Sequence, residues 1–376
     1  QYAEDEMKLI GQLQQQDGGF YRINQTSTRD VDGNKLTANY NEGIAYNYKS
    51  ISGYTSDPDR NQLLFMKQMG YAICGDVMNV VNTSVLGADS ILGVKYVLSS
   101  YDIPRLKKLE NIEPGNGKSV YYNPYALPVA FTYESSNMLP DSEEKDEFLY
   151  QNQLFSYLSG QNVQVNKRIE AEPKADSNTV GYDVKHMDDP VYGYFNMKDK
   201  DGGKVYVDDQ YVTLYNTWLC PRVVYIPQQP DAPSTHVHID GDNMENRVES
   251  ACFYYTDLNE LEKVTQKIQD RREDGLLIQD GSITGTVKNP QNLDRLYLSV
   301  PYDKGWSATL KVNGKKIKPE LVGNCMMSLP LENGENTIEM RYHVPGLKAG
   351  ICLSVVGAAA WAVIWWKERK NNITEK

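Results

Sequence analysis

A tyrosine-rich stretch over residues 41–56, with basic residues before and after it in the chain, carries the side chains best suited to binding a ligand. Aromatic rings stack on the faces of sugars, and Arg or Lys side chains bind phosphate oxygens through charge-assisted hydrogen bonds. We therefore predict that this set binds a sugar or phosphate group, with core packing of the tyrosines as the alternative. The predicted substrate-binding residues are Arg22, Tyr46, Tyr48, Tyr54 and Lys95.

Possible metal ligands occupy alternate positions of one predicted strand. His236, His238 and Asp240 would point to the same face because side chains alternate across a strand, and imidazole and carboxylate groups are common metal ligands. A later strand with the same pattern carries Thr337 and Glu339 at the matching positions. A solvated outer strand face is therefore the preferred interpretation over metal binding, and we predict neither a metal site nor a cofactor.

Catalytic motifs are not found in this sequence. It contains no GxSxG, no HExxH, no glycine-rich phosphate loop and no Cys/His pair. The acidic pairs at 188–189 and 208–209 could serve a glycosidase, but their turn-like settings favour solvated caps. Five cysteines at wide spacings, without CxxC, indicate neither a disulfide framework nor a zinc site. We predict no catalytic residue within this chain.

An uncharged apolar run over residues 349–366 predicts a transmembrane helix. Eighteen helical residues rise about 27 Å, close to the thickness of a hydrocarbon core. A buried hairpin helix is the alternative, although few soluble helices are apolar on every side. Basic residues follow the run, and the positive-inside rule then places the tail in the cytoplasm and the body outside the cell. The basic residues of the tail are Lys367, Arg369, Lys370 and Lys376.

The composition fits a folded body with an acidic surface. The chain has 376 residues, 40% of them hydrophobic, and a net charge of −11. This length is enough for two or three domains with their own cores. A broad acidic surface argues against nucleic acid as a partner, since binding the phosphate backbone requires a basic patch.

The alternation of residue types predicts an α+β protein that is mostly β. Short strands interrupted by helical segments fill the first part of the chain, and regularly spaced strands with Gly, Asp, Asn and Pro between them fill the rest. Residues 140–144 are expected to start a helix that Gly160 ends. We predict a mixed α/β domain over 1–139, a helix and a β-sandwich over 140–256, a linker helix and a second β-sandwich over 257–345, and a membrane helix with its tail over 346–370.

The sequence predicts an internal repeat that relates the two predicted sandwiches. Both contain a strand, a polar turn and a strand, and in the second copy the turn is Asn313-Gly314, a strong hairpin signal. Two sandwiches of one kind explain this similarity better than coincidence does. Coincidence is the alternative, because there are only two copies and their strand patterns are degenerate. The matching pairs are 204–212 with 309–317, 223–227 with 326–330, and 235–239 with 336–340.

Several phrases occur in this order along the chain: GFYRI, YNYKSISGYTS, LGVKYVLS, YYNPYALPVAF, QNQLFSYLSG, YDKGWSATLKVNGKKI and RYHVPGLKAG. Together they resemble the extracellular C-terminal half of the YfhO family of bacterial membrane proteins, including its last membrane helix. The resemblance covers nearly the whole chain. It implies a relationship to GT-C glycosyltransferases, which keep their catalytic acids in an early external loop that this sequence does not contain.

The resemblance implies a transferase that takes sugar from a polyprenyl-phosphate donor and decorates an envelope polymer such as lipoteichoic acid. The implied partners are a lipid-linked sugar or envelope polymer, the bilayer, and an upstream transmembrane bundle of the same protein that holds the active site. A membrane-anchored, non-enzymatic glycan-binding or scaffold module is the alternative. The upstream coding sequence would distinguish the two alternatives. A multi-span region with an early external Asp would favour the transferase over the binding or scaffold module.

Overall fold

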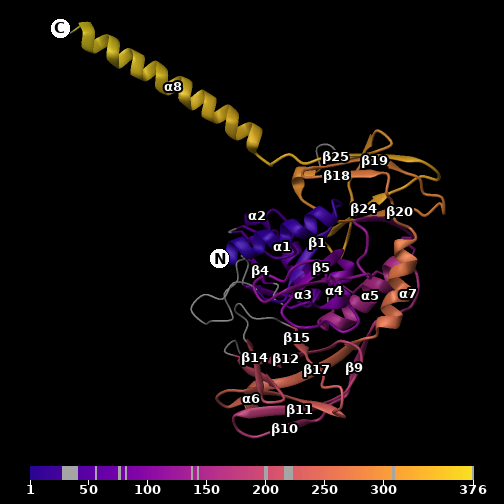
Figure 1. The fold of residues 1–376 in the computed structure, drawn as a ribbon. Coiled ribbons are helices and arrows are strands. Elements are labelled where there is room, and N and C mark those ends of the chain that lie inside the picture. Colours follow the sequence, from indigo (N-terminus) through magenta and orange to yellow (C-terminus); the bar gives the residue numbers. More distant parts are fainter. Residues whose placement is uncertain are drawn as a thin grey trace.

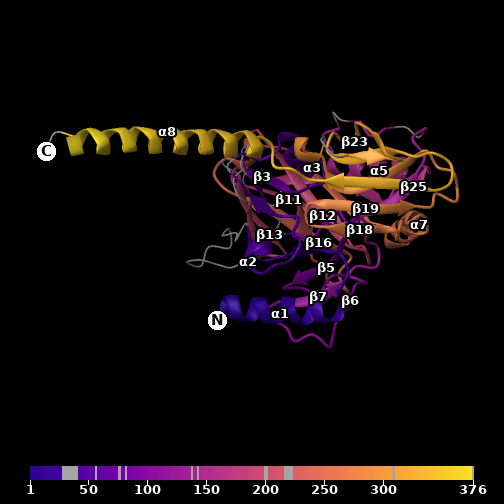
Figure 2. The ribbon, with the colours of Figure 1, turned by 90° about the horizontal axis from the view of Figure 1, so that it is seen from above.

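The protein contains a mixed α/β unit, two β-sandwiches and a long C-terminal helix (Figure 1). The predicted class, α+β with mostly β, is confirmed. Figure 2 shows helix α1 along one side of the body, away from helix α8. The computed structural model describes residues 1–27, 41–55, 57–74, 78–80, 83–136, 139–141, 144–198, 202–215, 223–306 and 310–374.

The first unit packs α1 (Tyr2–Gln16) against a four-stranded sheet of order β1-β5-β7-β6. Leu9 and Leu13 are one helical turn apart, so both reach the sheet, where they pack with Ile23 and Leu98. β1 runs parallel to β5, and β5 runs antiparallel to β7. The strands are β1 (Arg22–Gln25), β5 (Val94–Ser99), β6 (Lys107–Lys108) and β7 (Ser119–Tyr122).

A large central core joins this unit to the helices that follow it. Helix α5 starts at Glu147, where the Asp146 side chain accepts hydrogen bonds from the N–H groups of Phe148 and Leu149, and it ends at Gly160 in the left-handed conformation. The predicted helix start at 140–144 is therefore several residues too early. The other elements here are α2 (Glu42–Ala45), α3 (Arg60–Gln68), α4 (Leu86–Ile91), α5 (Glu147–Ser159) and the small sheet of β2 (Gly53–Tyr54), β3 (Ala72–Cys74) and β4 (Met78–Val80).

The first sandwich packs a sheet of order β15-β12-β17-β9 on one of order β10-β11-β16-β13-β14. Alternating residues of both sheets, such as Val237, Ile239 and Phe253, form its core. The elements are β9 (Asn166–Ile169), β10 (Pro173–Ala175), β11 (Thr179–Lys185), β12 (Val191–Met197), β13 (Gly203–Val207), β14 (Gln210–Tyr215), β15 (Val224–Ile226), β16 (Ser234–Asp240), α6 (Met244–Arg247) and β17 (Val248–Thr256).

The second sandwich repeats this arrangement with a sheet of order β18-β19-β25-β21-β22 on one of order β23-β24-β20-β8. β8 (Ala130–Tyr133) belongs to the stretch predicted as the first domain, yet it pairs with β20, as β17 pairs with β12. The other elements are β18 (Leu276–Gln279), β19 (Ser282–Val287), β20 (Arg295–Pro301), the 3-10 helix η1 (Lys304–Trp306), β21 (Lys311–Val312), β22 (Lys315–Lys316), β23 (Glu320–Val322), β24 (Met326–Pro330) and β25 (Asn336–Arg341).

The strand orders support the predicted repeat. The two five-stranded sheets match strand for strand when β10, β11, β13, β14 and β16 are placed on β18, β19, β21, β22 and β25. Val207 pairs with Val237 as Val312 pairs with Ile338, which is the register that the sequence predicts for 204–212 with 309–317 and for 235–239 with 336–340 within the described residues. The matched positions Val237 and Ile338 both face the cores.

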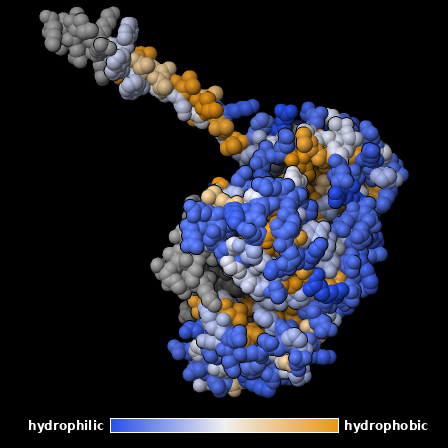
Figure 3. Space-filling view, viewed as in Figure 1, coloured by the Kyte–Doolittle hydropathy of each residue, from blue (hydrophilic) through white to orange (hydrophobic). Residues whose placement is uncertain are grey.

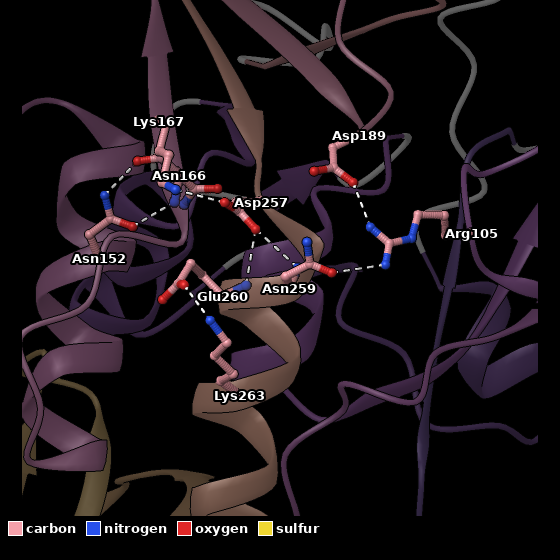
Figure 4. Close-up of polar contacts among 9 residues, drawn as sticks. All are labelled: Arg105, Asn152, Asn166, Lys167, Asp189, Asp257, Asn259, Glu260 and Lys263. Carbon is pink, nitrogen blue, oxygen red and sulfur yellow. Dashed lines mark hydrogen bonds and ion pairs between the residues drawn. The ribbon is translucent and has the colours of Figure 1, made fainter.

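Helix α7 (Leu258–Gln269) connects the sandwiches, and its N-terminus is a polar junction (Figure 4). The Asp257 carboxylate accepts hydrogen bonds from the N–H groups of Asn259 and Glu260 and forms a 2.6 Å ion pair with Lys167 of β9. Beside it, Arg105 of the first unit bonds to Asp189 and Asn259. The junction thus ties the first unit, the first sandwich and α7 together.

We expect Asp257→Ala to lower the free energy of unfolding by about 1–2 kcal/mol, because α7 loses its cap. Burial alone would raise the pKa of Asp257, but the Lys167 hydrogen bond and the helix N–H groups lower it below 3.8. A depressed carboxyl pKa contributes stability above the unfolded pKa and loses it as the pH falls through the folded one. Denaturant unfolding between pH 6 and pH 2 measures this.

The matched control is Asp257→Asn, which keeps the cap but cannot titrate. This variant should retain most of the cap stability at pH 6 and lose less stability than the wild type on acidification. If the wild type and both variants lost the same amount of stability between pH 6 and pH 2, the pKa of Asp257 would not be the cause of the acid destabilisation.

Helix α8 (Leu347–Thr374) leaves the body after β25. In the described part of the chain, residues Leu347–Lys367 form one helix long and apolar enough to cross a membrane, and none of that segment is buried. This agrees with the predicted membrane helix rather than with a buried hairpin.

Candidate functional site

A cleft of about 830 Å³ lies between the tyrosine-rich stretch of the first unit and one end of the second sandwich. The first wall includes α2, the residues leading to β2 and the start of α3. The second wall includes the β18–β19 turn, the end of β20, η1 and the residue after β25. Figure 3 shows the body hollowed beneath the start of α8. Two predicted site residues, Arg22 and Tyr48, line this cleft.

Aromatic rings from both walls line the cleft. Phe20 keeps 38% of its surface exposed, whereas Trp306 is buried and packs edge-on against Tyr342 with ring centroids 5.3 Å apart. Trp306 thus belongs to the sandwich core and also borders the cleft. The aromatic lining residues are Phe20, Tyr48, Tyr302, Trp306 and Tyr342.

Charged groups accompany the rings. The Lys49 ammonium reaches across the cleft to Asp280 at 2.5 Å. Asp303 accepts a 2.6 Å hydrogen bond from the Gly305 N–H, and burial together with the hydrogen bond to Asp303 raises the pKa of Tyr342. Tyr342 therefore remains a protonated donor at neutral pH. Such a mixture of rings, carboxylates and an ammonium can bind hydroxyl and phosphate groups of a sugar-containing ligand.

Arg22 lies beneath the cleft, and three hydrogen bonds tie its guanidinium to other parts of the protein. Its Nη1 donates to the Leu92 carbonyl at 2.6 Å and to the Ser299 hydroxyl at 3.0 Å, and Nη2 donates to the Ser299 carbonyl. Burial lowers the pKa of Arg22 to about 10. Because Ser299 belongs to β20, Arg22 holds the first unit against the second sandwich. Its role in ligand binding stays a prediction.

Tyr48 connects the cleft wall to a buried polar network. Its hydroxyl accepts a 2.7 Å hydrogen bond from Gln25, which also donates to Glu42 and accepts from Lys118. Burial raises the pKa of Tyr48, so its hydroxyl stays protonated. Tyr46 is half-buried after α2. These tyrosines therefore combine packing with partial exposure, and the two interpretations made from the sequence are compatible.

The structure does not bring all predicted site residues together. Lys95 forms a 2.5 Å ion pair with Asp17 and lies over the rings of Tyr21 and Tyr96, so it belongs to a different cluster. The backbone of Tyr54 is in β2, whereas its side chain lies outside the described part of the protein. Binding by Lys95 and Tyr54 stays a prediction.

The histidine pattern lies on the outer face of β16. Val237 and Ile239 point into the core, and His236 contacts Asp183 at 2.8 Å while His238 stacks on Tyr206. No group of three His, Cys, Asp or Glu side chains within the described ranges is arranged to hold a metal ion. Asp208 and Asp209 form the β13–β14 turn, both with positive φ, as the sequence indicates.

Sequence reasoning missed the second wall of the cleft. Asp280, Tyr302, Asp303 and Tyr342 lie more than 200 residues after the tyrosine-rich stretch, and each occurs in a turn or at a strand end. The YDKGW phrase at 302–306 carries part of the family resemblance, and the sequence favours Trp306 as a sandwich core residue over a sugar-binding platform. Its Asp and aromatic residues within one turn are the signal that could have pointed to a ligand site.

The cleft is fixed close to the start of α8. The Tyr342 N–H donates to the Gly281 carbonyl at 2.7 Å, and the His343 N–H donates to the Gly305 carbonyl at 3.0 Å. Gly281 has φ 75°, a conformation that favours glycine at this turn. Leu347, the first residue of α8, follows His343 by four residues, which can span at most about 14 Å.

Residues 1–354 match a family described as "Bacterial membrane protein YfhO". The match covers most of the chain and agrees with the apolar helix that follows the cleft. This chain belongs to the YfhO family. A similar protein is "Uncharacterized protein YfhO" of Bacillus subtilis (strain 168), which is 25% identical over 247 residues, equal to 64% of this chain and 26% of that protein.

The chain therefore spans about a quarter of the YfhO relative that it matches. The resemblance seen in the sequence is confirmed at the level of the family. Membrane association follows from the family and from α8. The relation to GT-C glycosyltransferases, the sugar donor and the polymer are proposals.

Proposed function

We propose that this chain is the extracellular region of a membrane glycosyltransferase and that its cleft holds the polar part of a lipid-linked sugar or an envelope polymer. The proposal rests on one observation: a cleft lined by aromatic rings and charged groups is tethered within about 14 Å of a membrane helix. Sugar transfer itself takes place in an upstream transmembrane bundle. The cleft presents the substrate to that bundle, and no catalytic role is assigned to its carboxylates.

The position of the cleft suits an amphipathic substrate. A polyprenyl-phosphate sugar keeps its chain in the bilayer and its phosphate and sugar at the surface. The tether places the Tyr342 wall of the cleft at this level, and Lys49 and Phe20 could contact the phosphate and a sugar face, respectively. A lipid-anchored polymer has the same arrangement of polar repeat and buried chain.

We expect Phe20→Ala and Lys49→Gln, each made in the intact protein, to lower glycosylation of the envelope polymer about tenfold. Loss of one stacking ring or one charge-assisted contact removes about 1–1.5 kcal/mol of binding. Both side chains are exposed, so the amount of folded protein should not change. The readouts are the sugar content of the polymer and the abundance of the protein.

Tyr211→Ala is the matched control, because Tyr211 is an aromatic residue 39% exposed on the first sandwich. It should leave glycosylation unchanged. Equal activity of all three variants would refute the cleft as the binding site. A different result would favour the non-enzymatic module. In that case the protein would transfer no sugar even with its complete upstream region, while the cleft variants would lose binding of the polymer.

The body is proposed to lie outside the cell, with the basic tail in the cytoplasm. The proposal follows from Lys367, Arg369 and Lys370 directly after the apolar segment. In intact cells, an impermeant thiol reagent should label a cysteine placed at the exposed Asp242 but not one placed at Asn372, each compared with the parent protein. The opposite labelling pattern would reverse the orientation.

A further inference from the structure

The first wall of the cleft carries the most exposed large apolar side chain of the described residues. Ile44 in α2 has 82% of its surface exposed, compared with 73% for Leu353, the most exposed large apolar residue among the described side chains of α8. The exposure is fixed by the helix, because Glu42 of the same turn is buried and accepts hydrogen bonds from Tyr2 and Gln25. Ile44 is therefore held outward by its surroundings.

The other side of the cleft leads directly into apolar surface. Val344 and Leu347, which follow the last residues fixed to the sandwich, are also exposed. Figure 1 shows α2 and the first turn of α8 towards the same end of the body, although Figure 2 shows them apart, with α2 beside α1. Figure 3 shows hydrophobic residues continuing from the junction along α8. Ile44, Val344 and Leu347 together form what we call the apolar rim.

The tether limits how far the rim can be from lipid. Leu347 begins the apolar segment, and the headgroup region is only about 5–8 Å thick on each side of the hydrocarbon core. With at most about 14 Å of chain between His343 and Leu347, the cleft wall next to Tyr342 lies in or just above the headgroups. Ile44 lines the same cleft as Tyr342.

We propose that the apolar rim inserts into the membrane interface, so that the cleft opens onto the lipid surface and a lipid-linked ligand can enter it sideways from the bilayer. The occupant of the rim is the bilayer, because Val344 and Leu347 lead into the segment that crosses it and Ile44 lines the cleft that ends at Tyr342. Ile44 anchors the first wall, while Val344 and Leu347 continue into α8. The insertion of Ile44 does not depend on which polar ligand the cleft binds.

An environment-sensitive fluorescent amino acid at position 44, in the complete protein reconstituted in nanodiscs, tests the insertion. We expect blue-shifted emission and at least twofold stronger quenching by lipids with a nitroxide near the headgroup than by lipids with a nitroxide at the chain end. The control probe replaces Leu149 of α5, an apolar residue 43% exposed, and should show neither effect.

Each outcome decides the proposal. Quenching at position 44 and not at 149 supports insertion. Blue-shifted emission without lipid quenching means that protein covers Ile44, either a second copy or the upstream bundle, and overturns the proposal. Emission typical of water at both positions overturns it as well. Phe20→Ala would leave the quenching at position 44 unchanged even where it abolishes glycosylation, so failure of insertion and failure of sugar binding are distinguishable.

Discussion

Lys118→Met should lower the free energy of unfolding of the body by about 3–5 kcal/mol, because it leaves a buried carboxylate without its partner. Glu6 and Lys118 form a 3.0 Å ion pair with side chains 0% and 1% exposed, between α1 and the start of β7. Lys118 also donates to Gln25, which supports Tyr48 at the cleft. Denaturant unfolding in detergent measures the loss.

Two controls separate burial from charge. Glu6→Gln combined with Lys118→Met removes both charges and should recover at least half of the lost stability, since replacing both members of a buried pair is often nearly neutral. Lys8→Met, two residues further along α1, breaks only the exposed pair with Glu113 and should have no measurable effect. A loss for Lys8→Met equal to that for Lys118→Met would contradict the explanation.

The fold was predictable where residue types repeat with the period of one element. Val237 and Ile239 alternate with His236 and His238, so the sequence indicates both the strand and its buried face, and the second copy indicates the same for Ile338 and Met340. The membrane helix was predictable because apolar residues cover all of its sides. The start of α5 was not, because several acidic residues before it could serve as caps and only Asp146 does.

The site was predictable only on one side. Tyr48 and Arg22 were selected for their chemistry, and both border the cleft, but the sequence gives no distance between them and residues 280–342. That proximity results from packing of β20 against the first unit, in which Ser299 contacts Arg22. Local patterns carry no signal for such a contact between distant segments. Lys95 does not line the cleft, because it forms an ion pair with Asp17, which precedes β1 in the chain. The sequence carries no signal for this contact either.

Arg22→Ala should lower the free energy of unfolding by about 3 kcal/mol. It should also loosen the contact between the two walls of the cleft. Three hydrogen bonds from its guanidinium to Leu92 and Ser299 would be lost. Each bond to a charged group contributes about 1.5–3 kcal/mol, and part of their sum is offset because the variant no longer buries a charge. At neutral pH the guanidinium is charged both folded and unfolded, even with its pKa lowered to about 10, so the loss should not vary between pH 5 and pH 8.

Arg22→Lys tests the geometry, because an ammonium keeps the charge but cannot form the same forked set of bonds, and it should recover only part of the stability. Lys95→Ala removes a cation that is paired at the surface of the same unit and should cost far less. Thermal unfolding and polymer glycosylation are measured together. If Arg22→Ala abolishes glycosylation with an unchanged melting transition, its guanidinium binds the ligand, as the sequence predicted. If activity falls only with the amount of folded protein, Arg22 shapes the cleft by holding its two walls together.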